Sequence, residues 1–189
     1  MQNIKKLIKK KALDSKPPFI VAVDGRSGSG KTTFADLLAK SLDTEVVHTD
    51  DFSTADDPLN WYQAFIDTVL QPVVEGKKTL EYYAASDTDK TKLITHTVPD
   101  ILIIEGVSSS RKEFCDYIDF AIFVETDKEE ARVRGIARDI SYGRTKEDAT
   151  RVWDFWSSAE DGYEKRDNPK ESADIVLDGA RPFEEQVTL

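Results

Sequence analysis

This sequence of 189 residues contains one cysteine, two histidines and no long apolar run. The single cysteine, Cys115, excludes an intrachain disulfide, so we expect a small buried thiol and a reducing, cytoplasmic compartment. Two histidines are too few for a histidine-rich metal site. Because no run has the length of a membrane span or of a signal-peptide core, we expect no membrane as a partner.

Basic residues are in the minority: 26 Lys and Arg stand against 36 Asp and Glu, a net charge of -10. An acidic surface repels nucleic-acid backbone and anionic lipid, so we expect neither as a general partner. An anionic nucleotide is not excluded, because backbone amides and one lysine can bind phosphate locally. The N-terminus carries apolar residues at helical spacing, which favours a packed first helix over a membrane-surface anchor.

Short apolar runs alternate along the chain with longer helical patterns. The runs cover residues 19–23, 46–47, 101–104, 120–124 and 175–177. Continuous runs, rather than strict alternation, are typical of strands buried on both faces of a parallel sheet. The order predicts one α/β domain, residues 1–189, with about five parallel strands and ligands at their carboxyl ends.

Four helices are predicted between these strands, over residues 32–42, from residue 57 onward, 126–140 and 146–163. The second opens at Asp57-Pro58, a cap followed by proline at the first helical position. The third opens at Thr126, where Glu129 completes a capping box.

Residues 25–32 read GRSGSGKT and match the pattern G-x-x-x-x-G-K-[ST], between an apolar run and a helical pattern. Glycines let backbone N–H groups approach phosphate oxygens, and the helix adds the positive end of its dipole. Lys31 then reaches the β- and γ-phosphates, and the Thr32 hydroxyl coordinates magnesium. The alternative is a glycine-rich turn with an incidental lysine. The motif predicts ATP and Mg²⁺ as ligands, with binding residues Gly25, Ser27, Gly28, Ser29, Gly30, Lys31, Thr32 and Thr33.

Carboxylates follow two of the predicted strands. Glu105 ends the run 101–104, the position of a Walker B residue that holds magnesium directly or through water. A solvated strand-end glutamate is the alternative. Asp50 and Asp51 follow the run 46–47, and either could accept the proton of an attacking hydroxyl or merely cap the next turn. We expect His48 to be a strand residue rather than a catalyst, and His96 to be structural or exposed.

Arg134 and Arg138 lie four residues apart, on one face of the third helix, and Arg144 follows it. Arginines on a mobile helix and loop could close over a nucleotide. The alternative is a surface ion pair between Glu130 and Arg134 that contributes little to stability. The aromatic side chains of the fourth helix are predicted to pack in the core rather than stack on a base: Trp153, Trp156 and Tyr163.

Separated segments are similar to one known group, the uridine kinases, phosphoribulokinases and bacterial pantothenate kinases. They read DGRSGSGKTT (24–33), TDDF (49–52), IIEGV (103–107) and RDISYGR (138–144). The resemblance implies a P-loop NTPase three-layer sandwich in which Asp50 is the general base and Glu105 assists magnesium. It also implies that residues 134–145 form a lid over ATP. The catalytic residues are then Asp50, Lys31 and Arg138, and the lid residues that bind ATP are Arg134, Arg138 and Arg144.

Residues 52–97 are too long for a simple crossover and are predicted to be a helical substrate-binding insertion, with an ordinary helical elaboration as the alternative. Where uridine kinases hold the nucleoside, this chain reads YYAASD (82–87), with no histidine or arginine nearby. The candidate acceptor-binding residues are Asp50, Phe52, Tyr82 and Tyr83. Residues 52–100 contain no arginine, eight acids and four lysines, which favours an uncharged acceptor, since phosphorylated acceptors are usually clamped by arginines.

These features predict a small-molecule kinase that transfers the γ-phosphoryl group of Mg-ATP to a hydroxyl of a neutral acceptor such as a nucleoside. The alternatives are a nucleoside monophosphate kinase and a non-catalytic ATP-binding regulatory protein. A GTPase is disfavoured, because the chain has no N-K-x-D motif. The partner expected is a small-molecule hydroxyl acceptor, and assembly into a homo-oligomer is left open.

Overall fold

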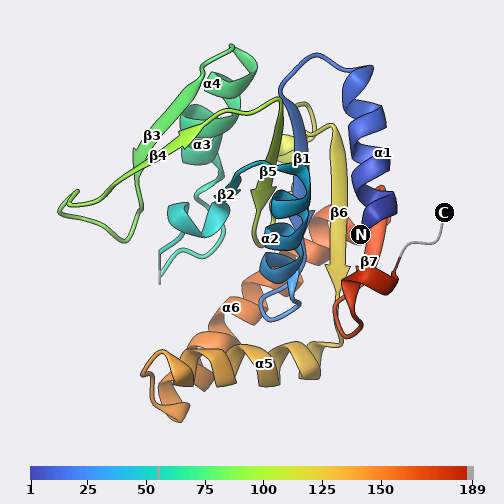
Figure 1. Cartoon of the computed structure of the whole chain (residues 1–189). Coiled ribbons are helices and arrows are strands. Elements are labelled where there is room, and N and C mark those ends of the chain that lie inside the picture. The colour runs from blue at the N-terminus through green and yellow to red at the C-terminus, as the bar shows by residue number, and fades with distance from the viewer. Residues whose placement is uncertain (55, 187–189) are drawn as a thin grey trace.

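The computed structural model describes residues 1–54 and 56–186 and has a five-stranded sheet at its centre (Figure 1). The strands are β1 (Phe19–Asp24), β2 (Val46–His48), β5 (Ile101–Glu105), β6 (Phe120–Glu125) and β7 (Ile175–Asp178). They lie in the order β2-β5-β1-β6-β7, and every neighbouring pair is parallel. The five apolar runs are therefore the five strands, and the predicted parallel α/β sheet is confirmed.

Both faces of the sheet are covered, which makes three layers. Every residue of β1 is buried. Val21 belongs to the core under α1 (Gln2–Leu13) and α2 (Lys31–Leu42), whereas Ala22 belongs to the core on the opposite face. Successive strand side chains point to opposite faces, so burial of both faces requires a continuous apolar run. The first helix packs as predicted, with Ile4 and Ile8 wholly buried.

The segment between β2 and β5 begins with a 3₁₀ turn (Thr49–Phe52) and continues into a helix. The helix runs through α3 (Tyr62–Phe65), a π-helical turn (Ile66–Leu70) and α4 (Gln71–Val74). The predicted start at Asp57-Pro58 is wrong. Asp57 caps a turn instead, because its carboxylate accepts a hydrogen bond from the Asn60 N–H at 2.9 Å.

The second part of this insertion is a hairpin, so the prediction of a purely helical insertion is also wrong. Strands β3 (Thr79–Tyr83) and β4 (Leu93–Thr97) pair antiparallel and extend to the side of the sheet (Figure 1). Leu80 and Tyr82 are buried and their neighbours in β3 are exposed. This alternation of apolar and polar residues, typical of a half-buried strand, was the sequence signal for the hairpin.

Two helices lie beyond the carboxyl ends of the central strands (Figure 1): α5 (Lys128–Ser141) and α6 (Lys146–Asp167). The N-cap of α5 is Asp127 rather than Thr126, since the Asp127 carboxylate accepts from two N–H groups of the first turn. Thr126 instead donates its hydroxyl proton to the Ser29 carbonyl at 3.0 Å. Helix α6 is one turn longer than predicted and ends at Asn168, in the left-handed conformation before Pro169.

The remaining elements are short: a 3₁₀ turn (Lys112–Phe114), α7 (Pro169–Ser172) and a 3₁₀ turn (Phe183–Glu185). Cys115, predicted to be buried, is exposed, because Phe114 fills the core position of that turn. Within the described ranges 1–54 and 56–186, the longest apolar stretch of any helix falls short of what crossing a membrane requires.

Asp24, the last residue of β1, connects three parts of the molecule. Its buried carboxylate accepts hydrogen bonds from the N–H groups of Gly25 (2.6 Å), Ser108 (3.0 Å) and Ser110 (2.8 Å). It also accepts from the hydroxyls of Ser110 (2.7 Å) and Tyr163 (2.6 Å). One side chain therefore joins the loop after β1, the turn after β5 and helix α6.

We expect Asp24→Asn to lower the free energy of unfolding by about 2 to 3 kcal/mol. Whichever way the amide is turned, its NH₂ faces at least one backbone N–H that then loses its acceptor. Urea unfolding at constant pH measures the change, and Asp36→Asn, at an exposed position of α2, is the control. Equal stability of the two variants would contradict the assignment of Asp24 as a connecting residue.

Candidate active site

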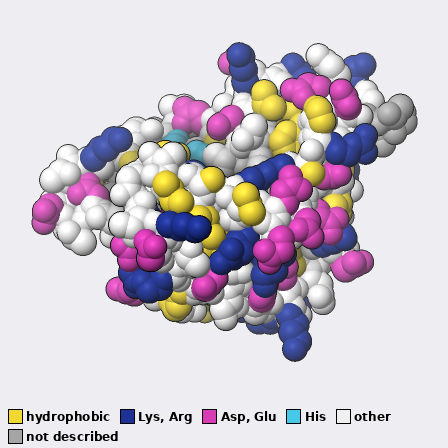
Figure 2. Space-filling view, turned by 90° about the horizontal axis from the view of Figure 1, so that it is seen from below, with side chains coloured by type: hydrophobic (Ala, Val, Ile, Leu, Met, Phe, Trp, Pro, Cys, Tyr) yellow, Lys and Arg dark blue, Asp and Glu magenta, His cyan; other side chains and the backbone are white. Residues whose placement is uncertain are grey.

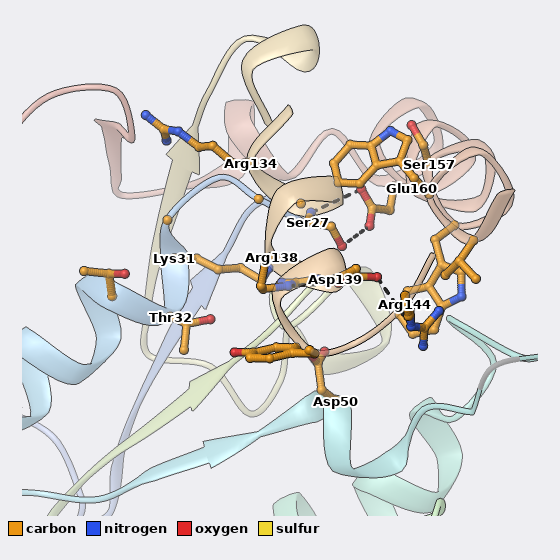
Figure 3. A pocket seen from close by; sticks show the side chains of 18 residues that line it. Ser27, Lys31, Thr32, Asp50, Arg134, Arg138, Asp139, Arg144, Ser157 and Glu160 are labelled. Carbon is orange, nitrogen blue, oxygen red and sulfur yellow. Dashed lines mark hydrogen bonds and ion pairs between the residues drawn. The ribbon is translucent and has the colours of Figure 1, made fainter. Parts of the chain in front are cut away.

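A cavity of about 770 Å³ opens at the carboxyl ends of the central strands. One wall is the loop 25–30 with the start of α2, a second is Asp50, and α5, α6 and their connection form the others. Figure 3 shows this arrangement, with Lys31 and Thr32 facing the lid residues across the cavity. The predicted residues on its wall are Ser27, Gly28, Gly30, Lys31, Thr32, Thr33, Asp50, Arg134, Arg138 and Arg144.

The loop 25–30 has the conformation that its glycines were expected to allow. Gly28 has φ +76°, and a Cβ placed there would lie 2.2 Å from the Ala131 carbonyl oxygen. Only glycine fits at this approach of α5 to the loop. Gly25 and Ser29 do not reach the cavity wall: the Ser29 hydroxyl is buried, and its carbonyl accepts the hydrogen bond from Thr126.

Beside the loop, Thr32, Glu105 and His48 form a hydrogen-bonded row. The Thr32 hydroxyl donates to Glu105 Oε1 at 2.9 Å, and His48 Nδ1 lies 2.6 Å from Glu105 Oε2. Burial alone would raise the pKa of Glu105, but the His48 contact and the charge of Lys31 lower it below its usual range. The pKa of His48 is raised, chiefly by the hydrogen bond to Glu105. His48 lies at a strand end as predicted, but its role beside Glu105 was missed.

This row is suited to a hard divalent cation. Because Thr32 donates its proton to Glu105, the lone pairs of the Thr32 oxygen remain available, and the Glu105 carboxylate adds further oxygens. No group of three or more His, Cys, Asp or Glu side chains in residues 1–54 and 56–186 could bind a metal alone. Magnesium bound beside phosphates needs only one or two protein oxygens.

The structure separates the two adjacent aspartates. Asp50 lines the cavity, whereas Asp51 turns to the hairpin and accepts a hydrogen bond from the Tyr82 hydroxyl at 3.0 Å. The Asp50 side chain is open to solvent within the cavity, yet protein surrounds its other sides. This desolvation raises the pKa of Asp50, and the charge of Lys31 offsets part of the rise.

The other predicted acceptor-binding residues do not reach this cavity. Phe52 packs against Phe65 and Tyr82, with ring centroids 5.1 and 4.9 Å apart. Tyr82 is buried, and its hydroxyl also lies 3.2 Å from His96 Nε2. Tyr83 is exposed on the opposite face of β3. Tyr82 therefore joins the hairpin to Asp51, and only a change in the position of the insertion could bring these rings to the cavity.

The predicted lid residues make both kinds of contact considered from the sequence. Arg134 pairs with Glu130, as in the ion-pair alternative, and also donates to the Gly179 carbonyl at 2.9 Å while lining the cavity. Arg138 and Arg144 converge on Asp139, at 3.0 and 3.8 Å (Figure 3). Asp139 was missed from the sequence, where it reads as one more charge on an exposed helix.

Helix α6 supplies a wall that sequence reasoning did not find. Trp153, Trp156, Ser157 and Glu160 all line the cavity. Trp153 also packs as predicted, since a Cβ on Gly135 of α5 would lie 2.2 Å from its ring. The spacing of these four residues along one helical face was the available signal, but nothing in the sequence indicated which element that face meets.

Seen from this end of the molecule, the described residues present no continuous basic region. Acidic and basic side chains lie beside one another around exposed apolar groups (Figure 2).

A model of the KAP family P-loop domain matches residues 1–160. The chain belongs to the KAP family of P-loop domains. This KAP-family chain is also similar to a uridine kinase of Ureaplasma parvum, with 26% identity over 152 residues that cover 68% of the chain and 72% of the relative. A uridine kinase of Lactobacillus johnsonii is 27% identical over 188 residues, which cover 87% and 88%.

The same fold occurs in the solved structure of a possible uridine kinase from Bacillus stearothermophilus. It superposes on this KAP-family chain with a TM-score of 0.63 at 20% identity and covers 94% of this chain and 98% of its own. The P-loop α/β fold and the resemblance to the uridine kinase group are thereby confirmed. Together these likenesses support a P-loop kinase of the uridine kinase type, a class that uses a nucleotide.

Proposed function

We propose that this chain transfers the γ-phosphoryl group of Mg-ATP to a hydroxyl of a neutral acceptor such as a nucleoside. The observation that carries this proposal is that the Asp50 carboxylate shares one cavity with Lys31, Thr32 and the lid arginines. A protein that only binds ATP has no need of a carboxylate facing the phosphate loop. A kinase uses such a group to accept the proton of the acceptor.

The phosphate loop and the lid bind the donor in this proposal. Backbone N–H groups of residues 27–33 and the Lys31 ammonium bind the phosphates of ATP, and Arg134, Arg138 and Arg144 close over them. Thr32 and Glu105 would hold Mg²⁺, which when bound offsets the negative charge of the phosphates. A closed lid excludes water and so prevents wasteful hydrolysis.

The transfer step needs one base and one oriented acceptor. Asp50 takes the hydroxyl proton, and the acceptor oxygen forms a bond to the γ-phosphorus while the bond to the β–γ bridging oxygen breaks. ADP leaves with the electron pair of that bond. Lys31 and Arg138 stabilise the negative charge on the transferred group.

We propose that the acceptor binds at the insertion, residues 52–97. This segment contains no arginine, which supports a neutral acceptor. Arg111 reaches the insertion from the turn after β5, but it is buried, pairs with Glu113 and donates to the Leu59 carbonyl. Lys77 and Lys78 lie in the exposed connection before β3, away from the cavity wall. A phosphorylated acceptor would therefore lack the arginine clamp that it usually needs.

The test is magnesium-dependent ADP formation from ATP with a panel of acceptors. The panel holds uridine, cytidine, pantothenate, nucleoside monophosphates and simple alcohols, and we expect stimulation by a neutral member. Stronger stimulation by the monophosphates would favour a nucleoside monophosphate kinase. ATP binding without stimulation by any acceptor would favour the regulatory alternative.

A further inference from the structure

Glu160 of α6 is bonded to the phosphate loop. Its carboxylate accepts a hydrogen bond from the Ser27 hydroxyl at 2.6 Å through Oε1 and from the Ser27 N–H at 3.2 Å through Oε2. Figure 3 shows both contacts. The side chain is 1% exposed, so this is a buried carboxylate on the loop that is proposed to bind phosphate. The proposed transfer step gives Glu160 no role.

Neighbouring contacts hold α6 in this position. Arg26 Nη2 pairs with Asp161 at 3.0 Å and with Glu164 at 2.7 Å, and the Tyr163 hydroxyl donates to Asp24. One stretch of α6, residues 160–164, thus binds three of the four consecutive residues 24–27. The Glu160 contact is part of a docked interface rather than an isolated side-chain position.

A carboxylate and a phosphate compete for the same donors. Each is an anion whose oxygens only accept hydrogen bonds, and an N–H that points at one of them is lost to the other. Two anions in contact within a protein cavity also repel each other strongly. Burial raises the pKa of Glu160, while Ser27 and the charge of Lys31 offset part of the rise. The N–H and the hydroxyl of Ser27 therefore already have the Glu160 carboxyl group as their acceptor.

We propose that the Glu160 carboxylate occupies a phosphate position of the loop and must leave it when a nucleotide binds, so that nucleotide binding displaces α6. This inference rests on the proposed use of ATP at the loop. The affinity for nucleotide is then reduced by the stability of the Glu160–Ser27 contact, because only the fraction of molecules with a free loop can bind.

The test compares ADP affinity, measured by calorimetry without acceptor, between the wild type and Glu160→Gln. The amide keeps the shape of the side chain but removes its charge, and we expect ADP to bind about tenfold more tightly or better. Asp154→Asn is the matched control: it removes an exposed carboxylate of the same helix that pairs with Arg132 of α5 and contacts no residue of the loop 25–30. We expect the control to change affinity by about threefold at most. Thermal unfolding verifies that each variant is folded, and Glu160→Ala repeats the comparison if Glu160→Gln is not.

A second readout follows the helix itself, because Trp156 lies one turn before Glu160 on α6. We expect ADP to change the tryptophan fluorescence of the wild type, and the nucleotide-free spectrum of Glu160→Gln to resemble that ADP-bound spectrum. Equal or weaker ADP binding by Glu160→Gln would overturn the proposal and make Glu160 a structural link between α6 and the loop. Absence of ADP binding in the wild type and in every variant would overturn nucleotide use at the loop as well.

Discussion

Asp50→Asn is expected to lower acceptor-stimulated ADP formation by about 10²- to 10⁴-fold, because the amide cannot take the proton of the acceptor hydroxyl. Binding of ADP without acceptor is expected to stay close to that of the wild type, since Asp50 faces the loop across the cavity and is not part of it. Steady-state kinetics and calorimetry on the same preparations separate the two effects.

Asp51→Asn is the matched control for this experiment. It makes the same chemical change one residue along the chain, at a carboxylate that accepts a hydrogen bond from Tyr82 and does not line the cavity. We expect it to retain most of the activity. If Asp51→Asn were inactive and Asp50→Asn active, the base would be Asp51 instead of Asp50. The Asp51 side chain, rather than that of Asp50, would then face the acceptor during the reaction.

The pH dependence of turnover tests the same assignment. A base works only when it is deprotonated, so activity should fall as the pH falls through the pKa of Asp50. Desolvation raises that pKa above the ordinary value of 3.8, and the acid limb of kcat/KM, which reports the free protein, is therefore expected above that value. An acid limb at or below 3.8 would contradict this environment for the base.

Lys31→Met is expected to lower the rate of phosphoryl transfer by about 10²- to 10³-fold, because the substitution removes a positive charge beside the transferred phosphoryl group, which becomes more negative during the reaction.

The same substitution is also expected to change the stability of the folded protein in a pH-dependent way. The Lys31 charge lowers the pKa values of Asp50, Glu105 and Glu160 in the folded protein. Without it, the folded-state pKa values of all three carboxyl groups rise.

The sign of the stability change follows from proton binding. The folded-state pKa values of Asp50 and Glu160 are already raised, and loss of Lys31 raises them further, so above the ordinary values of 3.8 and 4.5 the folded variant binds more protons than the unfolded chain. Its free energy of unfolding therefore falls as the pH rises through this range. We expect the stability deficit of Lys31→Met, relative to the wild type, to be larger at pH 8 than at pH 5 in urea unfolding.

Lys40→Met is the control, because it removes a lysine from an exposed position of the same helix. We expect it to leave stability nearly unchanged at both pH values. An equal deficit for Lys31→Met at pH 5 and pH 8 would mean that lost packing, not charge, accounts for the loss. The three carboxylates would then not depend on Lys31.

The sequence alone was enough for the central sheet and the phosphate loop, because both are encoded by neighbouring residues. A strand buried on both faces must be a continuous apolar run, as in 19–23. The loop needs glycine where α5 approaches it at Gly28, and its lysine and threonine follow at fixed spacing. The resemblance to the kinase group also indicated, from a four-residue segment, that Asp50 is the general base. The activity measurements above test that role.

Contacts between distant segments were decided only by the tertiary structure. Asp50 and Asp51 are chemically identical neighbours, and the 3₁₀ turn that holds them determines which one faces the cavity. Glu160 lies 133 residues from Ser27, so no local pattern relates them. From the sequence, Tyr82 was a candidate acceptor-binding residue, but the hairpin places its hydroxyl on Asp51. Local sequence determines which backbone conformations are favourable, whereas the partner of a buried polar side chain depends on how the finished elements pack.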